Sequence, residues 1–375
     1  MNKILNVFYR YSTLIFIIIL LITLFFGLRV KDFSFFNKAS FIRNPNGVHF
    51  EKYSISFSDI SEAKRNFLTH SFTIHFAFRP SKKAFKNNFQ FILMIHNGDD
   101  NKQFVVAQWK KWIIIMNGCD YSYARKEPRI SFKIDDVLNK ILFLTISSNS
   151  TGTKLFLNGR LMKEKKSLRL KLPISSNSYL ILGNNIYETA PWTGDIFGFC
   201  LINKTLSIDE IKASYKSWIE KKSFSIFKKL NPIILYSFKN LSNEFIEDLG
   251  SCNCPLNVPV FMPFFKKHMN FFDNNSQDIQ QNISDIVINF LGFIPLGFFS
   301  AFWLFKNFSF KKEKVNFLVA LFFCFFISLF IEVVQMWLPS RCSDISDIIF
   351  NVIGGACGIL IFHAIKFANI KKTKK

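Results

Sequence analysis

SDIVINFLGFIPLGFFSAFWLF (Ser284–Phe305) and VNFLVALFFCFFISLFIEVVQMWLPSRCSDISDIIFNVIGGACGILIFHAIKF (Val315–Phe367) make up most of the last quarter of the chain. Three apolar runs stand out in them, over residues 286–305, 315–338 and 345–367. Each run is close to the roughly 20 residues that a helix needs to cross the hydrocarbon core of a bilayer. Because a helix satisfies its own backbone hydrogen bonds in lipid, we expect a helical membrane domain over residues 284–367.

A fourth apolar run, Tyr11–Leu28, lies near the start of the sequence. The chain continues as GLRVKDF without a small-residue cleavage site, which favours an uncleaved membrane anchor over a signal peptide. Lys and Arg are concentrated in tail 1–10, loop 306–314 and tail 368–375, and short cytoplasmic flanks carry such an excess. We therefore predict four spans in the cell (inner) membrane, with both termini cytoplasmic and residues 29–283 extracytoplasmic.

The sequence is basic, with 48 Lys and Arg against 26 Asp and Glu and a formal net charge of +22. The charge that remains outside the membrane flanks falls mostly in the middle of the chain. A basic outer domain is suited to anionic lipid or to an acidic polysaccharide, although a solvated Lys-rich surface gives the same composition. The expected partners are membrane lipid and either a glycan or a lipid-linked cell-wall precursor, not nucleic acid.

Residues 44–220 have the pattern of an all-β domain. SFTIHFAFRP (Ser71–Pro80) alternates apolar and polar residues with a period of two, as a half-buried strand does. Further short apolar runs follow, separated by polar turns, which is typical of a sandwich. Asn158-Gly159 between two such runs predicts a tight hairpin, and Ser207 with Glu210 predicts a capping box at the start of a short helix.

Four stretches of this domain carry a resemblance to a known fold: SFTIHFAFRP, FLTISSNSTGTKLFLNGRL, LILGNN and WTGDIFGFCLINKTLSIDEI. In this order they resemble the concanavalin A-like, laminin G-type domain, which implies an all-β jelly-roll sandwich. Members of that group include carbohydrate binders, adhesion modules and glycosidases, so the resemblance does not fix an activity. A glycosidase needs two carboxylates across a groove, and no E-x-D-x-x-E strand supplies them here.

Two sets of side chains in the sandwich are candidates for ligand binding. Aromatic rings are able to stack on sugars or to pack in the core, and carboxylates are able to bind calcium or to shape turns. We expect no other metal or cofactor. The possible sugar-stacking residues are Trp109, Trp112 and Trp192, and the possible calcium ligands are Asp99, Asp100, Asp120 and Asp195.

Residues 221–283 are rich in polar residues and proline, and we interpret them as an extracytoplasmic linker that folds back against the sandwich or the membrane surface. Within it, PIILYSFKN (Pro232–Asn240) has the pattern of a strand. Cys252 and Cys254 lie in it as a Cys-x-Cys pair that does not easily close on itself. A disulfide from one of them to Cys342 is an alternative in an oxidising compartment.

Polar residues inside the apolar runs form the strongest functional signal. Their spacings of three and four place them on shared helix faces near the outer ends of the spans. Ionisable groups within membrane spans are costly to bury and point to a functional site. This predicted polar cluster comprises Asp285, Asn289, Glu332, Gln335, Arg341, Asp344, Asp347 and Asn351, and Ser343 or Asp344 is expected to cap the last helix.

The same residues resemble the double motif of the VanZ-like membrane family. Asp285, Asn289, Gly292, Phe293, Pro295 and Gly297 match its first part, and Glu332, Gln335, Pro339, Arg341, Asp344, Asp347, Asn351 and Gly354 match its second. The resemblance implies a cell-envelope setting, because the founding member is tied to teicoplanin resistance. Many members have His where this chain has Asn289, which argues against proton transfer by an imidazole here.

Two functions follow from these observations. The first is a non-enzymatic envelope protein whose outer sandwich binds glycan or protein and whose bundle affects glycopeptide antibiotic binding or surface polysaccharide. The second is an outer-leaflet enzyme that acts on a lipid-linked phosphate or glycan through Glu332, Arg341, Asp344 and Asp347. The cluster itself is either an outward-facing pocket or a hydrogen-bond network, Asn289–Gln335–Asn351, that holds the helices together.

Overall fold

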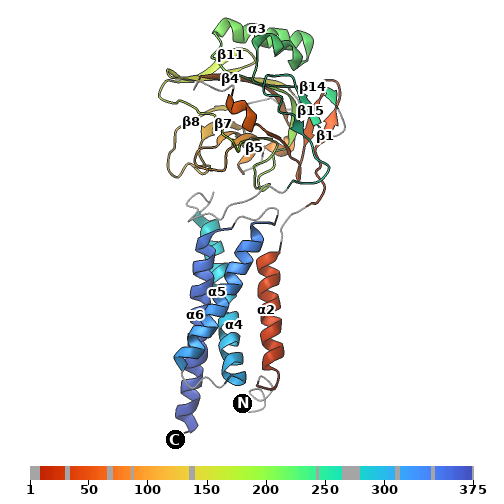
Figure 1. Cartoon of the computed structure of the whole chain (residues 1–375). Coiled ribbons are helices and arrows are strands. Elements are labelled where there is room, and N and C mark those ends of the chain that lie inside the picture. Colours follow the sequence, from red (N-terminus) through yellow and green to blue (C-terminus); the bar gives the residue numbers. More distant parts are fainter. Residues whose placement is uncertain are drawn as a thin grey trace. The chain divides into compact units, whose positions relative to one another are not determined.

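The computed structural model describes residues 9–29, 34–65, 71–85, 88–134, 140–241, 245–263, 279–308, 313–338 and 343–373. The chain forms two compact units. Phe33–Phe265 is a β unit, and Met1–Asp32 together with Lys266–Lys375 is a helical unit (Figure 1).

The β unit is one continuous hydrogen-bonded sheet that folds into two packed layers (Figure 1). The path β11-β10-β9-β4-β13-β14 forms one layer, β3-β12-β5-β6-β7-β8 forms the other, and β15 and β16 join them. Strands β1 and β2 attach to β13. The bounds are β1 Ser40–Ile42, β2 Gly47–Phe50, β3 Ser56–Asp59, β4 Phe72–Pro80, β5 Gln90–His96, β6 Phe104–Trp109, β7 Trp112–Asn117, β8 Arg129–Lys133, β9 Leu142–Asn149, β10 Gly152–Leu157, β11 Arg160–Lys165, β12 Tyr179–Leu182, β13 Gly194–Ile202, β14 Ile234–Leu241, β15 Phe245–Asp248 and β16 Leu256–Asn257.

Strand β4 shows how the alternating pattern builds the sandwich. Phe72, Ile74 and Phe76 point into the main core between the layers. The intervening residues face the other side, where helix α3 (Ile208–Lys221) and the 3-10 helix η3 (Phe224–Leu230) cover the sheet. The period of two is therefore confirmed, but the strand is buried on both faces and not on one, because these helices close the outer side.

Two local predictions in the β unit are confirmed. Asn158 and Gly159 connect β10 to β11 with φ values of +51° and +74°, the positive values that a type I′ turn requires. Helix α3 begins with a capping box: the Ser207 hydroxyl accepts the Glu210 N–H at 3.2 Å, and the Glu210 carboxylate accepts the Ser207 N–H at 2.7 Å. Each pair satisfies a backbone donor that the helix leaves unpaired.

The segment predicted as a linker is in part a component of the sandwich. Strands β14, β15 and β16 lie within residues 221–283 and complete the sheet between β13 and β3. Ile234, Tyr236 and Phe238 of β14 are fully buried in the main core. Strand β14 coincides with the strand predicted over Pro232–Asn240, whereas polar residues hide the shorter β15 and β16 in the sequence, so the sandwich extends beyond residue 220.

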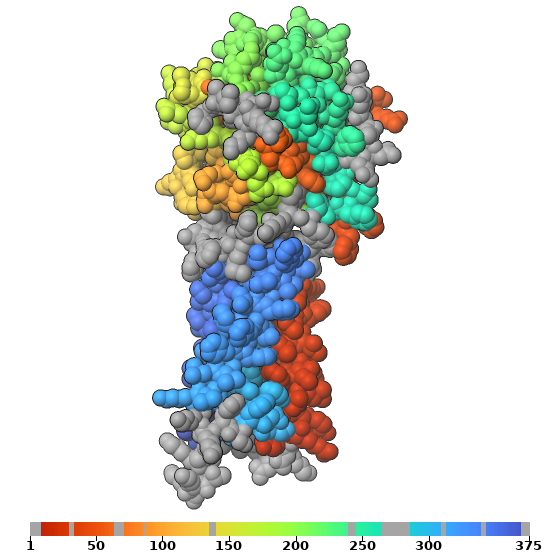
Figure 2. Space-filling model, viewed as in Figure 1, coloured from red at the N-terminus to blue at the C-terminus, as the bar shows by residue number. Residues whose placement is uncertain are grey.

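The helical unit contains α2 (Ser12–Leu28), α4 (Ile279–Asn307), α5 (Glu313–Gln335) and α6 (Ile345–Thr373). Within them, Ile286–Asn307, Glu313–Gln335 and Ile345–Ala368 are long and apolar enough to span a membrane, whereas α2 has 17 residues. Helix α2 nevertheless packs in the bundle, beside α5 in Figure 2. The Phe16 ring stacks on Trp303 of α4 with 5.1 Å between ring centroids.

Helices α4 and α6 cross at very close range because glycines line the contact. A Cβ atom on Gly297 would lie 2.0 Å from the backbone oxygen of Gly355, and one on Gly354 would lie 2.0 Å from that of Phe290. Gly358 has the same relation to the Ile294 oxygen, again at 2.0 Å. Small residues permit such approach between membrane helices, and the backbone-to-backbone contact excludes any larger side chain at these positions.

Candidate functional site

The predicted polar cluster is distributed over the ends of α5 and α6 that lie together in the bundle. Glu332 is 1% exposed, and its carboxylate accepts the N–H of Asp344 at 3.1 Å. The Ser343 hydroxyl donates to the Glu332 carbonyl at 2.5 Å. Asp344 in turn caps α6, because its Oδ1 accepts the Ser346 N–H at 2.7 Å. Glu332 therefore ties the end of α5 to the start of α6.

Two further members of the cluster also connect helices. Gln335 donates to the backbone oxygen of Gly27 in α2 at 2.7 Å, and Asn351 of α6 donates to the Ser328 hydroxyl of α5 at 3.0 Å. These contacts of Gln335 and Asn351 are with residues outside the predicted network Asn289–Gln335–Asn351. Among the residues that the structure describes, the Oδ1 atom of Asn351 is buried without a hydrogen-bond partner.

The structure gives less information on the remaining members of the predicted polar cluster. Asn289 is half-buried in α4, and Asp347 is half-buried in the first turn of α6. Asp285 lies in α4, but its side chain is outside the described part of the chain, as is Arg341 as a whole. Glu332, Gln335 and Asn351 each make at least one hydrogen bond to another helix or to the segment leading into it, an arrangement that favours bundle assembly.

The three candidate tryptophans of the β unit differ sharply in exposure. Trp109 and Trp112 are 36% and 38% exposed and lie directly opposite each other at the end of the β6–β7 hairpin. Trp192 is fully buried, and its indole N–H donates to the Gln108 side chain at 2.8 Å. The sugar-stacking prediction for Trp192 is therefore wrong, because its ring packs in the main core.

Gln108 is a residue that sequence reasoning missed. Its amide accepts from Trp192 on one side and donates to the Lys110 backbone oxygen at 3.0 Å on the other. The buried indole thus holds the turn that presents the two exposed indoles. Only the register of β6 and β7 places these groups together, so the sequence contains no signal for the link.

The four candidate calcium ligands do not form one cluster. Asp195 on β13 binds Arg79 at 2.7 Å and His49 at 2.6 Å. Asp100 in the β5–β6 loop accepts from Tyr187 at 2.8 Å and pairs with His96 at 2.9 Å. Asp99 pairs with Lys102, and Asp120 accepts the Glu127 N–H. Their carboxylates are engaged in separate places, which fits the turn-shaping alternative.

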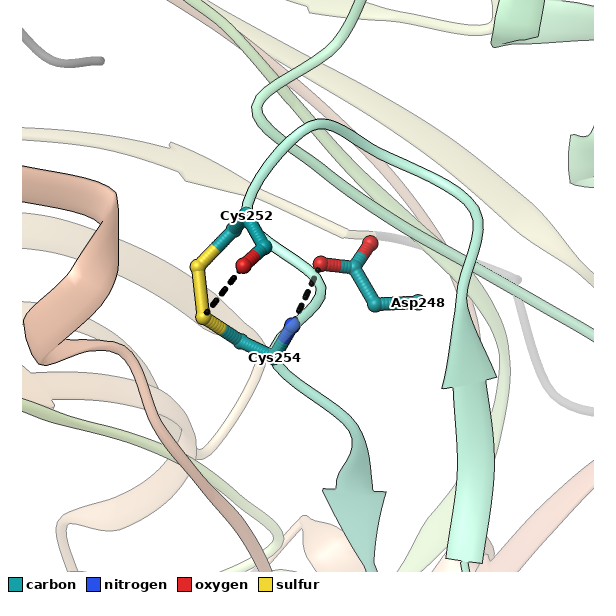
Figure 3. Close-up of side chains that lie close together, drawn as sticks. All are labelled: Asp248, Cys252 and Cys254. Atoms are coloured by element: carbon teal, nitrogen blue, oxygen red, sulfur yellow. Dashed lines mark hydrogen bonds between the residues drawn. A yellow bond between two sulfur atoms is a disulfide. The ribbon is translucent and has the colours of Figure 1, made fainter. Parts of the chain in front are cut away.

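Asp248 at the end of β15 lies together with Cys252 and Cys254, with donor atoms within 4.8 Å of one another (Figure 3). Cys252 and Cys254 form a disulfide, so the prediction that this pair does not close is wrong. Asn253 between them has φ +54°, which turns the chain back and leaves 5.2 Å between the two Cα atoms, within the usual range. The alternative partner, Cys342, is outside the described residues.

Asp248 organises the turn around this disulfide. One carboxylate oxygen accepts the N–H groups of Leu235 and Gly250 at 2.7 and 2.8 Å, and the other accepts that of Cys254 at 3.0 Å. Burial raises the pKa of the Asp248 carboxyl, and these three bonds oppose the rise. Because the sulfurs are bonded and the oxygens are occupied, the cluster braces the connection from β15 to β16.

His75 is a buried titratable group that the sequence did not single out. It lies on the helix-covered face of β4 between the rings of Phe143 and Phe227, and its Nδ1 is 2.8 Å from the Thr145 hydroxyl. Burial lowers the pKa of His75 to about 3, because a charged imidazole at this position would have no water around it. His75 is therefore neutral in the folded β unit at ordinary pH.

The two units together define the class of protein: an all-β sandwich combined with a bundle of apolar helices suited to a membrane. Residues 220–366 match the family model described as VanZ/LLP1, so the C-terminal region of the chain is VanZ-like. The matched region begins before the predicted membrane domain and includes β14–β16. This agrees with the resemblance seen in the motif residues.

No curated protein matches the chain in a sequence comparison. Among solved structures, the botulinum neurotoxin type G receptor binding domain has a TM-score of 0.37 and 19% identity, covering 51% of this chain and 47% of that one. The CBM40 domain of the Ruminococcus gnavus IT-sialidase, bound to α2,3-sialyllactose, has a TM-score of 0.35 and 16% identity, covering 44% of this chain and 95% of that one. The chain spans about half the length of the neurotoxin domain.

Proposed function

We propose that this protein is a non-enzymatic cell-envelope protein that crosses the membrane four times and binds glycan through its outer β unit. The exposed Trp109–Trp112 pair carries the glycan part of the proposal. Two indoles on adjacent strands offer flat apolar surface, and exposed aromatic rings of this kind stack on the apolar faces of sugars. We also propose that the sandwich is a laminin G-type domain.

The contacts of α2 support four spans. Gln335 bonds the last turn of α2 to α5, and Lys306 of α4 donates to the Ser12 hydroxyl at the first turn of α2 and to the Tyr9 carbonyl just before it. Helix α2 is therefore held in the bundle at both ends. The basic flanks of the sequence support a topology with both termini in the cytoplasm and the polar cluster at the outer end.

Thiol labelling in intact cells tests this topology. Lys216→Cys on the exposed face of α3 is expected to react with a membrane-impermeant maleimide, while Lys372→Cys reacts only after permeabilisation. The unmodified chain is the control, because its free Cys119 and Cys200 are buried. Equal labelling of both positions in intact cells would contradict the topology.

The environment of Glu332 supports a non-enzymatic role for the bundle. A general acid or base has to reach its substrate, whereas the Glu332 carboxylate is buried and accepts the Asp344 N–H. The alternative, an outer-leaflet enzyme using Glu332, Arg341, Asp344 and Asp347, requires this contact to open. The simpler interpretation is that the Glu332 carboxylate holds the end of α5 against the start of α6.

Glycan-array binding by the excised Phe33–Phe265 unit tests the binding function. Trp109→Ala and Trp112→Ala are each expected to weaken binding about 5- to 30-fold, since one stacked ring contributes roughly 1–2 kcal/mol. Phe245→Ala, which removes an aromatic ring that is 48% exposed on β15, is the matched control and is expected to leave binding unchanged. Equal binding by all four proteins would refute glycan recognition at the hairpin.

A further inference from the structure

We infer that Phe36 and Phe261, two exposed rings of the β unit, insert into the lipid interface at the outer surface of the membrane. The inference rests on the proposed topology, in which α2 crosses the membrane and the β unit follows on the outer side. It comes from the position of the two rings, which lie where the chain enters and leaves the β unit.

The two rings form one exposed apolar patch. They are 61% and 59% exposed, and 5.3 Å separates the ring centroids of Phe36 and Phe261. The two residues are bridge partners on antiparallel segments, so their side chains point to the same face. Large apolar side chains that lie together on a surface mark a site of contact with a membrane or a protein.

Hydrogen bonds and buried side chains hold this patch in a fixed position on the β unit. The Asn37 N–H donates to the Val260 carbonyl at 2.9 Å, and the Asn37 side-chain amide donates to the carbonyls of Ile55 and Pro259, each at 2.8 Å. Met262 belongs to a buried apolar cluster that includes Ile55. A surface that is already ordered loses little conformational entropy on binding.

The backbone beside the rings is hydrogen-bonded, which lowers the cost of placing it in lipid. The Ser34 hydroxyl accepts the Phe36 N–H at 3.2 Å and donates to the Phe36 carbonyl at 2.9 Å. The Met262 N–H donates to the Phe35 carbonyl at 2.9 Å. Because an unpaired backbone group is costly in lipid, these bonds suit the patch to an interfacial position.

The covalent connection to α2 keeps the patch near the membrane. Phe36 follows Leu28, the last residue of α2, by eight positions. A fully extended chain spans at most about 3.6 Å per residue, so Phe36 lies within about 29 Å of the end of α2. The chain leaves the β unit beside Phe261, so both connections to the helical unit start at the patch. This favours the patch as the part of the β unit that meets the bilayer.

Lipid is the partner that fits the chemistry of the patch. Aromatic rings beside a cation are typical of segments that lie at the boundary between lipid headgroups and acyl chains. Lys38, two positions after Phe36, is exposed, and its Nζ lies 5.6 Å from the centroid of the Tyr53 ring. The two phenylalanine rings then enter the acyl boundary while the ammonium group stays at the level of the headgroups.

Electron paramagnetic resonance of the full-length protein in lipid nanodiscs tests the inference, with a nitroxide attached at Phe261→Cys. Oxygen concentrates in lipid and nickel-EDDA in water, so their collision rates with the label report its surroundings. We expect the label to lie about 5–10 Å inside the interface, with the oxygen rate above the nickel rate. Lys216→Cys on the exposed face of α3 is the matched control, with the reverse order of rates.

A second substitution tests whether the rings cause the insertion. Phe36→Asp in the labelled protein is expected to move the label at residue 261 into water, because a charged group is costly in lipid. Leu161→Asp, which places the same charge at a side chain 46% exposed on β11, is expected to leave the rates unchanged. Equal effects of the two substitutions would count against insertion by the rings.

The outcomes separate this inference from the proposed topology, which thiol labelling in intact cells tests independently. If that labelling agrees with the topology but the label at residue 261 behaves like the label on α3, the inference alone is overturned. Low collision rates with both reagents would show that protein covers the patch, and would overturn the inference as well.

Discussion

Gly354→Ala is expected to disrupt the packing of α4 against α6 and to lower the stability of the helical unit by about 3 kcal/mol or more. The added methyl group would lie 2.0 Å from the Phe290 backbone oxygen and would therefore overlap it. A flexible side chain is able to move aside, but this contact is with helix backbone. The two helices must therefore separate along their crossing, which also loosens the neighbouring contacts of Gly297 and Gly358.

The chain contains a matched control for this substitution. Gly292 lies on the same helix as Gly297 and is exposed, and a Cβ atom there meets nothing within 4 Å. Gly292→Ala is expected to leave stability unchanged or slightly raised, because Ala is the better helix former. Thermal unfolding of both variants in detergent measures the difference, and equal melting temperatures would show that α4 and α6 do not cross at the glycines.

The free energy of unfolding of the β unit is expected to fall as the pH drops from about 6.5 to about 3, through His75. The folded state keeps the pKa of this imidazole at about 3, whereas the unfolded chain restores the ordinary value of 6.5. Between these values the unfolded state binds the extra proton, so acid favours unfolding. The slope approaches about 1.4 kcal/mol per pH unit, an upper bound for one group.

Urea unfolding of the Phe33–Phe265 unit at a series of pH values measures this slope. His75→Phe is expected to remove the His75 part, so the difference between the two profiles isolates it from other groups. The comparison is needed because the raised pKa of Asp248 acts with the opposite sign, stabilising the folded state as the pH falls. Thr145→Val loses the hydrogen bond of His75 but should keep the slope. Parallel profiles for wild type and His75→Phe would rule out the mechanism.

Patterns that depend on neighbouring residues were visible in the sequence. The three long apolar runs, the Asn158-Gly159 turn and the capping box at Ser207 are each determined within a few residues, and the structure contains them. The VanZ-like motif falls in this group, because its spacing records which residues share a helix face. Four spans remain a prediction, since α2 is shorter than the other three helices.

Features that depend on distant residues were not visible. The sequence suggests sugar stacking for Trp192 as for Trp109 and Trp112, because no neighbouring residue indicates that its ring is buried. Gln108 and the main core, which enclose the ring, are distant in the sequence. The Cys252–Cys254 disulfide depends on a left-handed residue at Asn253 and on Asp248, which holds the turn. In the bundle, Gln335 pairs with a backbone oxygen of α2, and a main-chain acceptor leaves no trace in the sequence.

The two ends of the β unit are fastened to each other. Phe36 and Phe261 form an antiparallel bridge, the Asn37 N–H donates to the Val260 carbonyl at 2.9 Å, and the Met262 N–H donates to the Phe35 carbonyl at 2.9 Å. A domain whose ends meet behaves as a cassette, since removing it leaves a gap that a few residues can close. We therefore expect that the β unit can be removed or replaced while the helices of the helical unit keep their connections.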